Sequence, residues 1–264
     1  MKYKQMKRLL KIVSIIIIVF GILYMLKEVN SAYDKTLCKG MIVNISYQDS
    51  IIIIDDKEII EYTYGLYNDI SKIRIKDINL SSISEIIKTH PYVLSAKIFK
   101  GVDGYIHAEV IQRSPLVRVF NTHSESFIID REGVIIPLRS TEVLRIPVAS
   151  GFIIEKFDDI KFKNVNALVN NQKSLLNIYD FAMEISKDNF LTEQISQIYI
   201  LKNGNIEIIP AIGNHTIHIG NLTNLEEKLF KLHILYSRIA TVTNMKKYSY
   251  VNLEYKNQIV CKKI

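Results

Sequence analysis

The sequence predicts an α+β protein made of an N-terminal transmembrane helix, a compact β-α-α-β-β domain, and a C-terminal β domain of antiparallel strands with packed helices. Three observations predict it: an apolar run over residues 9–26, two helices followed by a β-hairpin within residues 40–112, and frequent short strands over residues 113–264. The chain has 264 residues, of which 48% are hydrophobic, so it is long enough to bury a core in each of two domains.

The apolar run reads LLKIVSIIIIVFGILYML and contains one charge, Lys11, close to its start. At a rise of about 1.5 Å per residue, a helix of this length just spans a hydrocarbon layer of about 30 Å. Lysine and arginine residues dominate the tail of residues 1–8, so the positive-inside rule places the N-terminus in the cytoplasm and everything beyond the run outside. A cleaved signal peptide is the alternative, but Ser31-Ala32 is a poor cleavage site, and we expect an uncleaved anchor.

The first domain is expected to follow a juxtamembrane linker of residues 27–39. Gly40–Tyr47 is predicted to form a strand, and a short helix is predicted around Lys57–Tyr62. A capping box from Ser82 to Glu85 would open a second helix. Two strands with alternating apolar residues then flank Gly101–Gly104, a sequence that suits a hairpin turn. The two helices should cover one face of a small sheet.

The second domain, residues 113–264, is predicted to be rich in short strands. Asn203-Gly204 is the strongest short hairpin signal in the chain, because it lies between two apolar runs. A helix is expected over residues 174–186, and a Thr223–Glu226 capping box would start a longer helix. The apolar stripe of that longer helix, which should pack against a sheet, consists of Leu225, Leu229, Leu232, Tyr236 and Ile239. The last strands are expected over Tyr248–Tyr255 and 258–262.

Residues that could carry chemistry are few and scattered. His215 and His218 would point to opposite faces of a strand, which disfavours a shared metal ion, and we expect them to be polar surface residues. Asp55-Asp56 and Asp158-Asp159 are adjacent carboxylates in expected turns, whereas acid–base catalysis needs carboxyl groups that face one another across a cleft. No hydrolase, P-loop or metalloprotease motif occurs. We therefore predict no enzyme activity, no catalytic residue, no metal and no cofactor.

Charge and cysteine content limit the remaining function classes. The net charge of +7 could indicate nucleic acid, but basic residues are spread along the chain outside the tail, and an exported domain would not meet nucleic acid. No small-molecule substrate is indicated. Cys38 and Cys261 could pair in an oxidising compartment, yet they stand at opposite ends of the exported sequence, and a disulfide is not favoured.

Several short motifs resemble the FtsQ/DivIB family of bacterial cell division proteins. The anchor followed by strand–helix–helix–strand–strand is similar to a POTRA domain behind a signal anchor. Weak matches to family elements continue in order along nearly the whole chain, and the richness in Ile, Asn and Lys resembles a Bacteroidota-type member. The matching segments are His90-Pro91-Tyr92-Val93, Arg113-Ser114-Pro115, residues 129–138, Ile219-Gly220, and residues 250–255, where Asn252 and Glu254 replace the Asp and Arg of the family.

The resemblance implies a bitopic scaffold in the inner membrane at the division septum. Its POTRA domain would contact other divisome membrane proteins, and its β domain would bind FtsB-like and FtsL-like proteins and help to regulate septal peptidoglycan synthesis. In this family the final strands form the docking edge, because an open sheet edge can accept a partner strand. The residues that this predicts as partner-binding are Tyr250, Val251, Leu253, Tyr255, Ile259 and Val260. The same residues could instead be ordinary core positions.

Two other functions compete with the scaffold. A membrane-anchored periplasmic enzyme acting on the cell wall would need a catalytic constellation, which the sequence does not offer. An export or outer-membrane assembly factor with POTRA domains would usually carry several such units or a barrel, for which this chain has no room.

Overall fold

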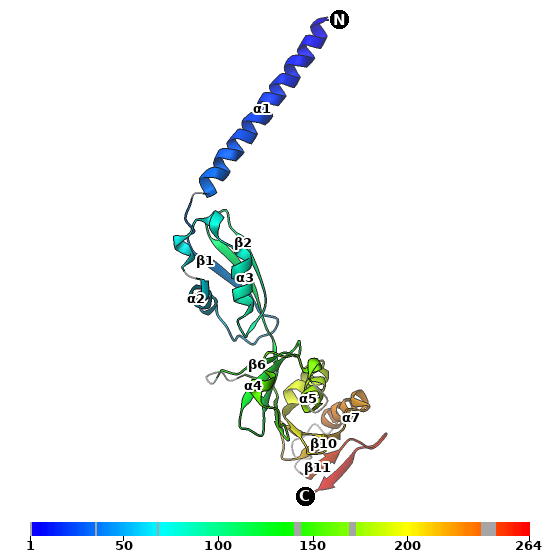
Figure 1. The fold of residues 1–264 in the computed structure, drawn as a ribbon. Coiled ribbons are helices and arrows are strands. Elements are labelled where there is room, and N and C mark those ends of the chain that lie inside the picture. The colour runs from blue at the N-terminus through cyan, green and yellow to red at the C-terminus, as the bar shows by residue number, and fades with distance from the viewer. Residues whose placement is uncertain (1, 35, 68, 140–143, 169–172, 239–246) are drawn as a thin grey trace. The chain divides into compact units, whose positions relative to one another are not determined.

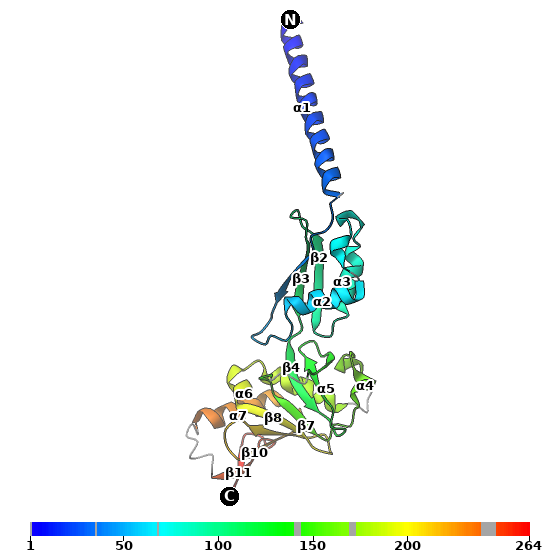
Figure 2. The same ribbon diagram turned by 90° about the vertical axis from the view of Figure 1, so that its left-hand side faces the viewer.

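The computed structural model describes residues 2–34, 36–67, 69–139, 144–168, 173–238 and 247–264. The chain divides into two compact units (Figures 1 and 2). Unit 1 comprises Met1–Ser46 and Ile54–Gln112, and unit 2 comprises Tyr47–Ile53 and Arg113–Ile264.

Helix α1 (Lys2–Asp34) precedes the small sheet of unit 1. The side chains described between residues 11 and 28 are exposed, among them many large apolar ones. Among the residues that the structure describes, we find no helix with both the length and the apolar character that a membrane crossing requires. Residues 1–10, 12 and 29–35, which include the whole of the expected cytoplasmic tail, have side chains outside the described set.

Unit 1 beyond α1 has the predicted order β-α-α-β-β. Its three-stranded sheet has the order β1-β3-β2, with β1 parallel and β2 antiparallel to the central strand. The strands are β1 (Met41–Ser46), β2 (Val93–Lys100) and β3 (Ile106–Gln112); the helices are α2 (Asp56–Tyr67) and α3 (Leu80–Lys88), with 3-10 turns η1 (Ile70–Lys72) and η2 (Ile75–Asp77) between them. Helices α2 and α3 pack together on β1 and β2 and bury Ile59, Ile83 and Ile87 completely.

Two details of unit 1 differ from the sequence prediction. Helix α3 begins two residues before Ser82, because the Asn79 side chain accepts the backbone N–H of Ser82 and acts as the N-cap. The expected capping box at Ser82 is therefore wrong. The Asp55 carboxylate accepts the N–H of Glu58, so this aspartate caps the N-terminus of α2 instead of lying in a free turn.

Unit 2 is built on a nine-stranded sheet of order β12-β11-β10-β9-β8-β7-β4-β5-β6. The strands are β4 (Pro115–Phe120), β5 (Ser126–Asp130), β6 (Ile135–Pro137), β7 (Val148–Gly151), β8 (Ile195–Ile200), β9 (Ile206–Pro210), β10 (Thr216–Gly220), β11 (Tyr248–Asn252) and β12 (Val260–Lys263). Short elements α4 (Phe157–Ile160) and η3 (Val165–Ala167) follow β7. Helices α5 (Lys173–Ile185), α6 (Asn189–Gln194) and α7 (Leu225–Arg238) lie over one face of the sheet (Figure 2).

The sheet of unit 2 is mixed, which corrects the prediction of antiparallel strands. The pairs β4–β7, β7–β8 and β10–β11 are parallel. Parallel neighbours require a crossover connection, and the chain supplies one through α7 between β10 and β11 and another through α5 and α6 between β7 and β8. Strand β7 has no clear alternation and was not predicted.

One apolar core joins the helices to the sheet. Phe127, Ile198, Ile208 and Ile217 come from four strands, and Phe181 comes from α5; all are fully buried. In α7 the described members of the predicted stripe face this core, while Ile239 lies outside the described residues. The helix begins at Leu225, directly after Asn224 at φ 54°, so the expected capping position Thr223 stands one residue further out.

The motif segments near residues 113 and 130 meet at a buried corner. Arg113 Nη1 lies 2.8 Å from Asp130 Oδ2, and the backbone N–H of Arg131 donates to the carbonyl of Ser114. Asp130 has no exposed surface. Burial raises the pKa of Asp130, and the bonds from Arg113 and the Val134 N–H offset only part of that effect. These motif residues therefore stabilise the start of unit 2.

Candidate functional site

The C-terminal strands form one end of the unit 2 sheet. Strand β12 pairs with β11 in antiparallel register, and among the described residues no strand pairs with its other edge. Val260 is 43% exposed, and Lys262, Lys263 and Ile264 are exposed as well. Unpaired main-chain groups on such an edge can accept a further strand. We define the docking edge as Val260–Lys263.

The structure separates the six predicted partner-binding residues. Tyr250 and Val251 belong to β11, an inner strand, so the expected edge position of the 250–255 segment is wrong. Val251 and Leu253 are fully buried in the core, whereas Tyr255 is 49% exposed in the segment after β11. Ile259, directly before β12, packs against the core. Of the six residues, only Val260 lies in the edge strand β12. β12 takes the outer place because the more apolar β11 is needed to cover the core.

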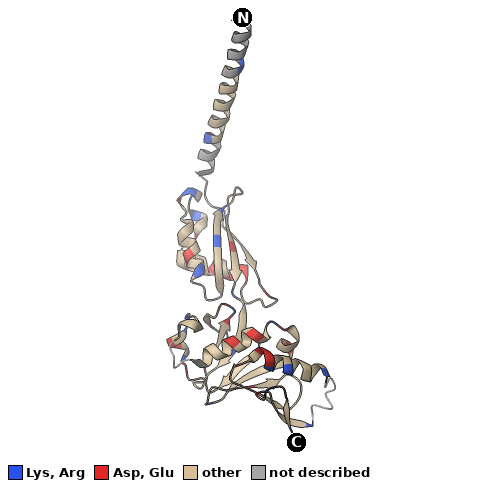
Figure 3. Ribbon diagram, turned by 90° about the vertical axis from the view of Figure 1, so that its right-hand side faces the viewer, with Lys and Arg blue, Asp and Glu red and all other residues tan. Residues whose placement is uncertain are grey.

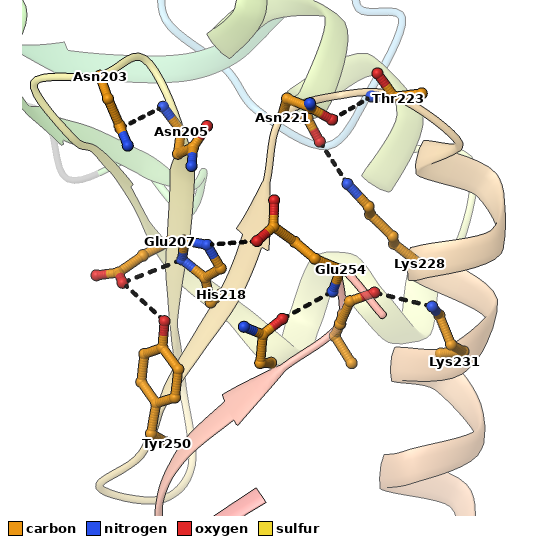
Figure 4. Close-up of polar contacts among 12 residues, drawn as sticks. Asn203, Asn205, Glu207, His218, Asn221, Thr223, Lys228, Lys231, Tyr250 and Glu254 are labelled. Atoms are coloured by element: carbon orange, nitrogen blue, oxygen red, sulfur yellow. Dashed lines mark hydrogen bonds and ion pairs between the residues drawn. The ribbon is translucent and has the colours of Figure 1, made fainter. Parts of the chain in front are cut away.

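Helix α7 holds the segment that directly follows β11, the strand beside the docking edge, and Figure 4 shows Lys231 of α7 reaching this segment. Lys231 Nζ donates to the carbonyls of Leu253, at 2.8 Å, and Tyr255, at 2.9 Å. The backbone N–H of Leu253 also donates to the carbonyl of His218 on β10. The end of β11 is thus fixed by a helix and by its neighbouring strand, and it gives β12 a firm support.

Lys228 fixes the segment that links β10 to α7. This lysine is only 5% exposed, and its Nζ donates to the carbonyl of Asn221 at 2.7 Å (Figure 4). Burial lowers the pKa of Lys228. A polar cavity of about 330 Å³ lies beside it, lined by residues that include Glu227, Lys231 and Glu254.

A polar cluster occupies the sheet face opposite α7. His218 on β10 lies between two carboxylates: its Nδ1 is 3.3 Å from Glu207 of β9, and its Nε2 is 3.2 Å from Glu254 (Figure 4). The Tyr250 hydroxyl donates to Glu207, and its ring stacks on His218 with centroids 6.0 Å apart. Burial and the charge of Glu207 raise the pKa of Tyr250.

This cluster joins three strands, β9, β10 and β11. The two carboxylates approach His218 from different nitrogens, and no group of three metal-ligating side chains suited to an ion occurs among the described residues. The prediction that His215 and His218 face opposite ways is confirmed, since His215 contacts Tyr236 of α7. Both histidines are largely buried, however, and the expectation of surface residues was wrong.

Sequence reasoning missed Glu207, His218 and Lys231 as members of this region. The alternation in β10 could have placed His218 on the open face, because Ile217 and Ile219 flank it and point to the core. The two lysines of α7 gave no such signal, since lysine on a helix usually lies in solvent. Cys38 and Cys261 are both unpaired.

The C-terminal strands and the β-α-α-β-β unit agree with two family models. Residues 114–262 match the model described as FtsQ/DivIB, C-terminal related, and residues 36–111 match the model of a POTRA-like domain. The comparison with curated proteins gives no match. The first match covers more than half of the chain, and the predicted family resemblance is confirmed: the chain belongs to the FtsQ/DivIB-related family.

Proposed function

We propose that this protein is a bitopic cell division scaffold that recruits and links divisome proteins at the septum and helps to regulate septal peptidoglycan synthesis. Its FtsQ/DivIB-related and POTRA-like domains point to a division scaffold. Domains of these two kinds are typically non-catalytic, and we expect no enzyme activity. The observation that carries the proposal is the open docking edge in a chain of this family.

FtsB-like and FtsL-like proteins are the partners that we assign to the docking edge. A partner strand added beside β12 would satisfy its outward main-chain groups, and the exposed Val260 side chain would supply an apolar contact. Tyr255 and Ile259 lie next to this strand in the chain and would border the bound segment. Val251 and Leu253 would act from the core by holding β11 in place, without contacting the partner.

The membrane topology is part of the same proposal. Residues 9–26 would span the inner membrane once, with residues 1–8 in the cytoplasm and the linker of residues 27–39 on the periplasmic side. The sequence of residues 9–26 and the basic tail support this topology. We propose residues 40–112 as the POTRA domain, which would contact other divisome membrane proteins, and residues 113–264 as the partner-binding β domain.

The test combines localisation with partner capture. A fluorescent fusion should gather at the septum, and the full chain purified from membranes should bring down FtsB-like and FtsL-like proteins. Val260→Asp places a charge on the docking edge and should weaken this capture by roughly tenfold or more, as expected for an anchor residue of an interface. Ile154→Asp is the control, since Ile154 is similarly exposed, at 50%, but lies in the loop after β7.

Two results would contradict the assignment. Diffuse membrane fluorescence without either partner would remove the scaffold function. Undiminished capture by Val260→Asp would keep the scaffold but move the partner site away from β12.

A further inference from the structure

Basic side chains gather at the end of unit 1 where the chain arrives from α1. Four of them lie on three neighbouring segments, and we call them the basic end: Lys39, Arg74, Lys76 and Lys100. The N–H of Cys38 donates to the carbonyl of Ile73, and the N–H of Ile75 donates to the carbonyl of Thr36. Lys39 also donates through its backbone to Gly104, so the arriving chain is bound to both η2 and the β2–β3 turn.

The basic end keeps a net positive charge, because its four basic side chains outnumber the two nearby carboxylates, Asp77 of η2 and Asp103, and among the described residues none of the four forms an ion pair. Lys39 Nζ donates to the backbone carbonyl of Asp103 at 2.7 Å, and Lys100 Nζ donates to the backbone carbonyl of Lys76 at 3.3 Å. Within the described part of the chain, no carboxylate forms an ion pair with Arg74 or Lys76, and both are exposed. The nearby Asp103 carboxylate is paired with His107 instead. Figure 3 shows Lys and Arg at this end of the unit.

Two large apolar side chains stand among these charges. Leu37 is 58% exposed, and Val102, at the tip of the β2–β3 turn, is fully exposed. Both belong to the surface that the basic end forms, because Leu37 bridges to Arg74 and Val102 lies in the turn that Lys39 contacts. Exposed apolar residues within a basic surface are the combination that binds an anionic lipid interface.

The opposite end of unit 1 carries the opposite charge. Helix α2 starts at that end, since its Glu58 pairs with His90, which lies just before the first residue of β2. Asp55 directly precedes α2, and the first turns of the helix contain Asp56, Glu58 and Glu61 against a single lysine, Lys57. The unit therefore has a basic end toward the arriving chain and an acidic end away from it.

The length of the intervening chain brings the basic end close to the proposed membrane. Residues 27–34 continue α1 beyond the apolar run and add about 12 Å at 1.5 Å per residue. A headgroup layer occupies roughly 5–7 Å of that distance. Residues 35–38 add a tether of at most about 14 Å when fully extended, so the basic end can come within the Debye length of about 8–10 Å of the lipid charges.

We propose that the basic end of the POTRA-like unit lies on the anionic phospholipid surface from which the chain emerges, with Val102 inserted among the headgroups. This contact rests on the membrane anchoring in the proposed function. It would fix the unit's orientation, with its acidic end directed away from the bilayer and toward other proteins.

The chain contains no tryptophan, so the fluorescence of a single introduced tryptophan reports on the position where it is placed. In Val102→Trp, reconstituted as the full chain in vesicles of three parts phosphatidylcholine to one part phosphatidylglycerol, we expect blue-shifted emission and quenching by brominated lipid. Both effects should weaken in phosphatidylcholine alone and at high salt. Lys88→Trp places the probe at the end of α3, on the far side of the unit, and should show neither effect.

Neutral substitutions in the basic end test whether its attraction to anionic lipid drives the docking. In the Val102→Trp background, Arg74→Gln and Lys76→Gln should each lower the ratio of docked to undocked protein by roughly fivefold, the equivalent of about 1 kcal/mol per basic residue near an anionic surface. Lys97→Gln, which removes an exposed charge from the middle of β2, is the matched control and should leave quenching unchanged.

Membrane anchoring through residues 9–26 is measured separately, by flotation of the full chain with vesicles after an alkaline wash. Flotation without quenching of the Val102→Trp probe would overturn the docked basic end and leave the anchor intact. Loss of flotation would overturn both. Equal quenching from the Val102 and Lys88 positions would also refute the orientation.

Discussion

Substitution of Arg113 by methionine should destabilise unit 2 in a way that depends on pH. Arg113 Nη1 is 2.8 Å from the Asp130 carboxylate, which has no exposed surface. Removing the guanidinium leaves a buried charge without its ion-pair partner, a change that costs about 3–5 kcal/mol when the carboxylate is ionised. Methionine keeps most of the apolar volume, so the loss is chiefly electrostatic.

The pH dependence follows from the raised pKa of Asp130. Because the folded-state pKa lies above the unfolded value of about 3.9, the folded chain holds this proton more tightly. Stability contributed by the protonated group is therefore present at low pH and is lost as pH rises through the folded-state pKa. Arg113→Met removes an interaction that lowers this pKa, so the pH range in which folded Asp130 stays protonated extends to higher pH. The destabilisation should be small where Asp130 is protonated and should reach its full size near neutral pH.

Native-state hydrogen exchange on peptides from β4 and β5 can measure the effect without assuming that the two units unfold together. Asp130→Asn should show little pH dependence, because the buried group no longer ionises. The double variant Arg113→Met with Asp130→Asn should be less destabilised at neutral pH than Arg113→Met alone, since no unpaired charge remains. An equal loss of opening free energy by Arg113→Met at pH 5 and pH 7.5 would refute the reasoning.

Three further predictions concern residues that stabilise the fold and the strands behind the docking edge. Leu253→Ala should lower the stability of unit 2 by about 2–5 kcal/mol, because it opens a cavity in a fully buried site; a loss below about 1 kcal/mol in chemical denaturation would contradict that. Lys231→Met should speed hydrogen exchange in β11 but not in β4, as it removes the donor to Leu253 and Tyr255. Asn79→Ala should cost about 0.5–2 kcal/mol in unit 1, while Ser82→Ala should cost much less; the reverse order would restore the capping box.

Local signals in the sequence predicted much of the secondary structure. Asn203-Gly204 forms the turn of the β8–β9 hairpin, with Gly204 at φ 83°, a conformation that glycine adopts without strain. The hairpin at Gly101–Gly104 and the two helices of unit 1 were also found, because their apolar periodicity and turn residues lie close together in the chain.

Long-range pairing could not be predicted in the same way. Strand β7 lies between β4 and β8 in parallel register, although β5 and β6 separate it from β4 in the chain and a long helical connection separates it from β8. Its sequence Val-Ala-Ser-Gly has little alternation, and its place depends on the close approach of two backbones. A Cβ atom at Gly151 would collide with the backbone of Ile200 on β8, so only glycine permits this pairing. A glycine within a short apolar segment was the one available signal.

The same distinction explains the partial prediction of the docking edge. Residues 250–255 have a clear strand pattern near the C-terminus, and the family resemblance places the docking edge there. Alternating apolar residues instead favour an inner strand, where one face of the strand is buried against the core. Val251 and Leu253 accordingly enter the core. The outer place goes to Val260–Lys263, where lysines discourage indiscriminate pairing between sheet edges. Those lysines leave the main-chain groups of β12 open to a strand that matches them, and selective recognition at a sheet edge requires both properties.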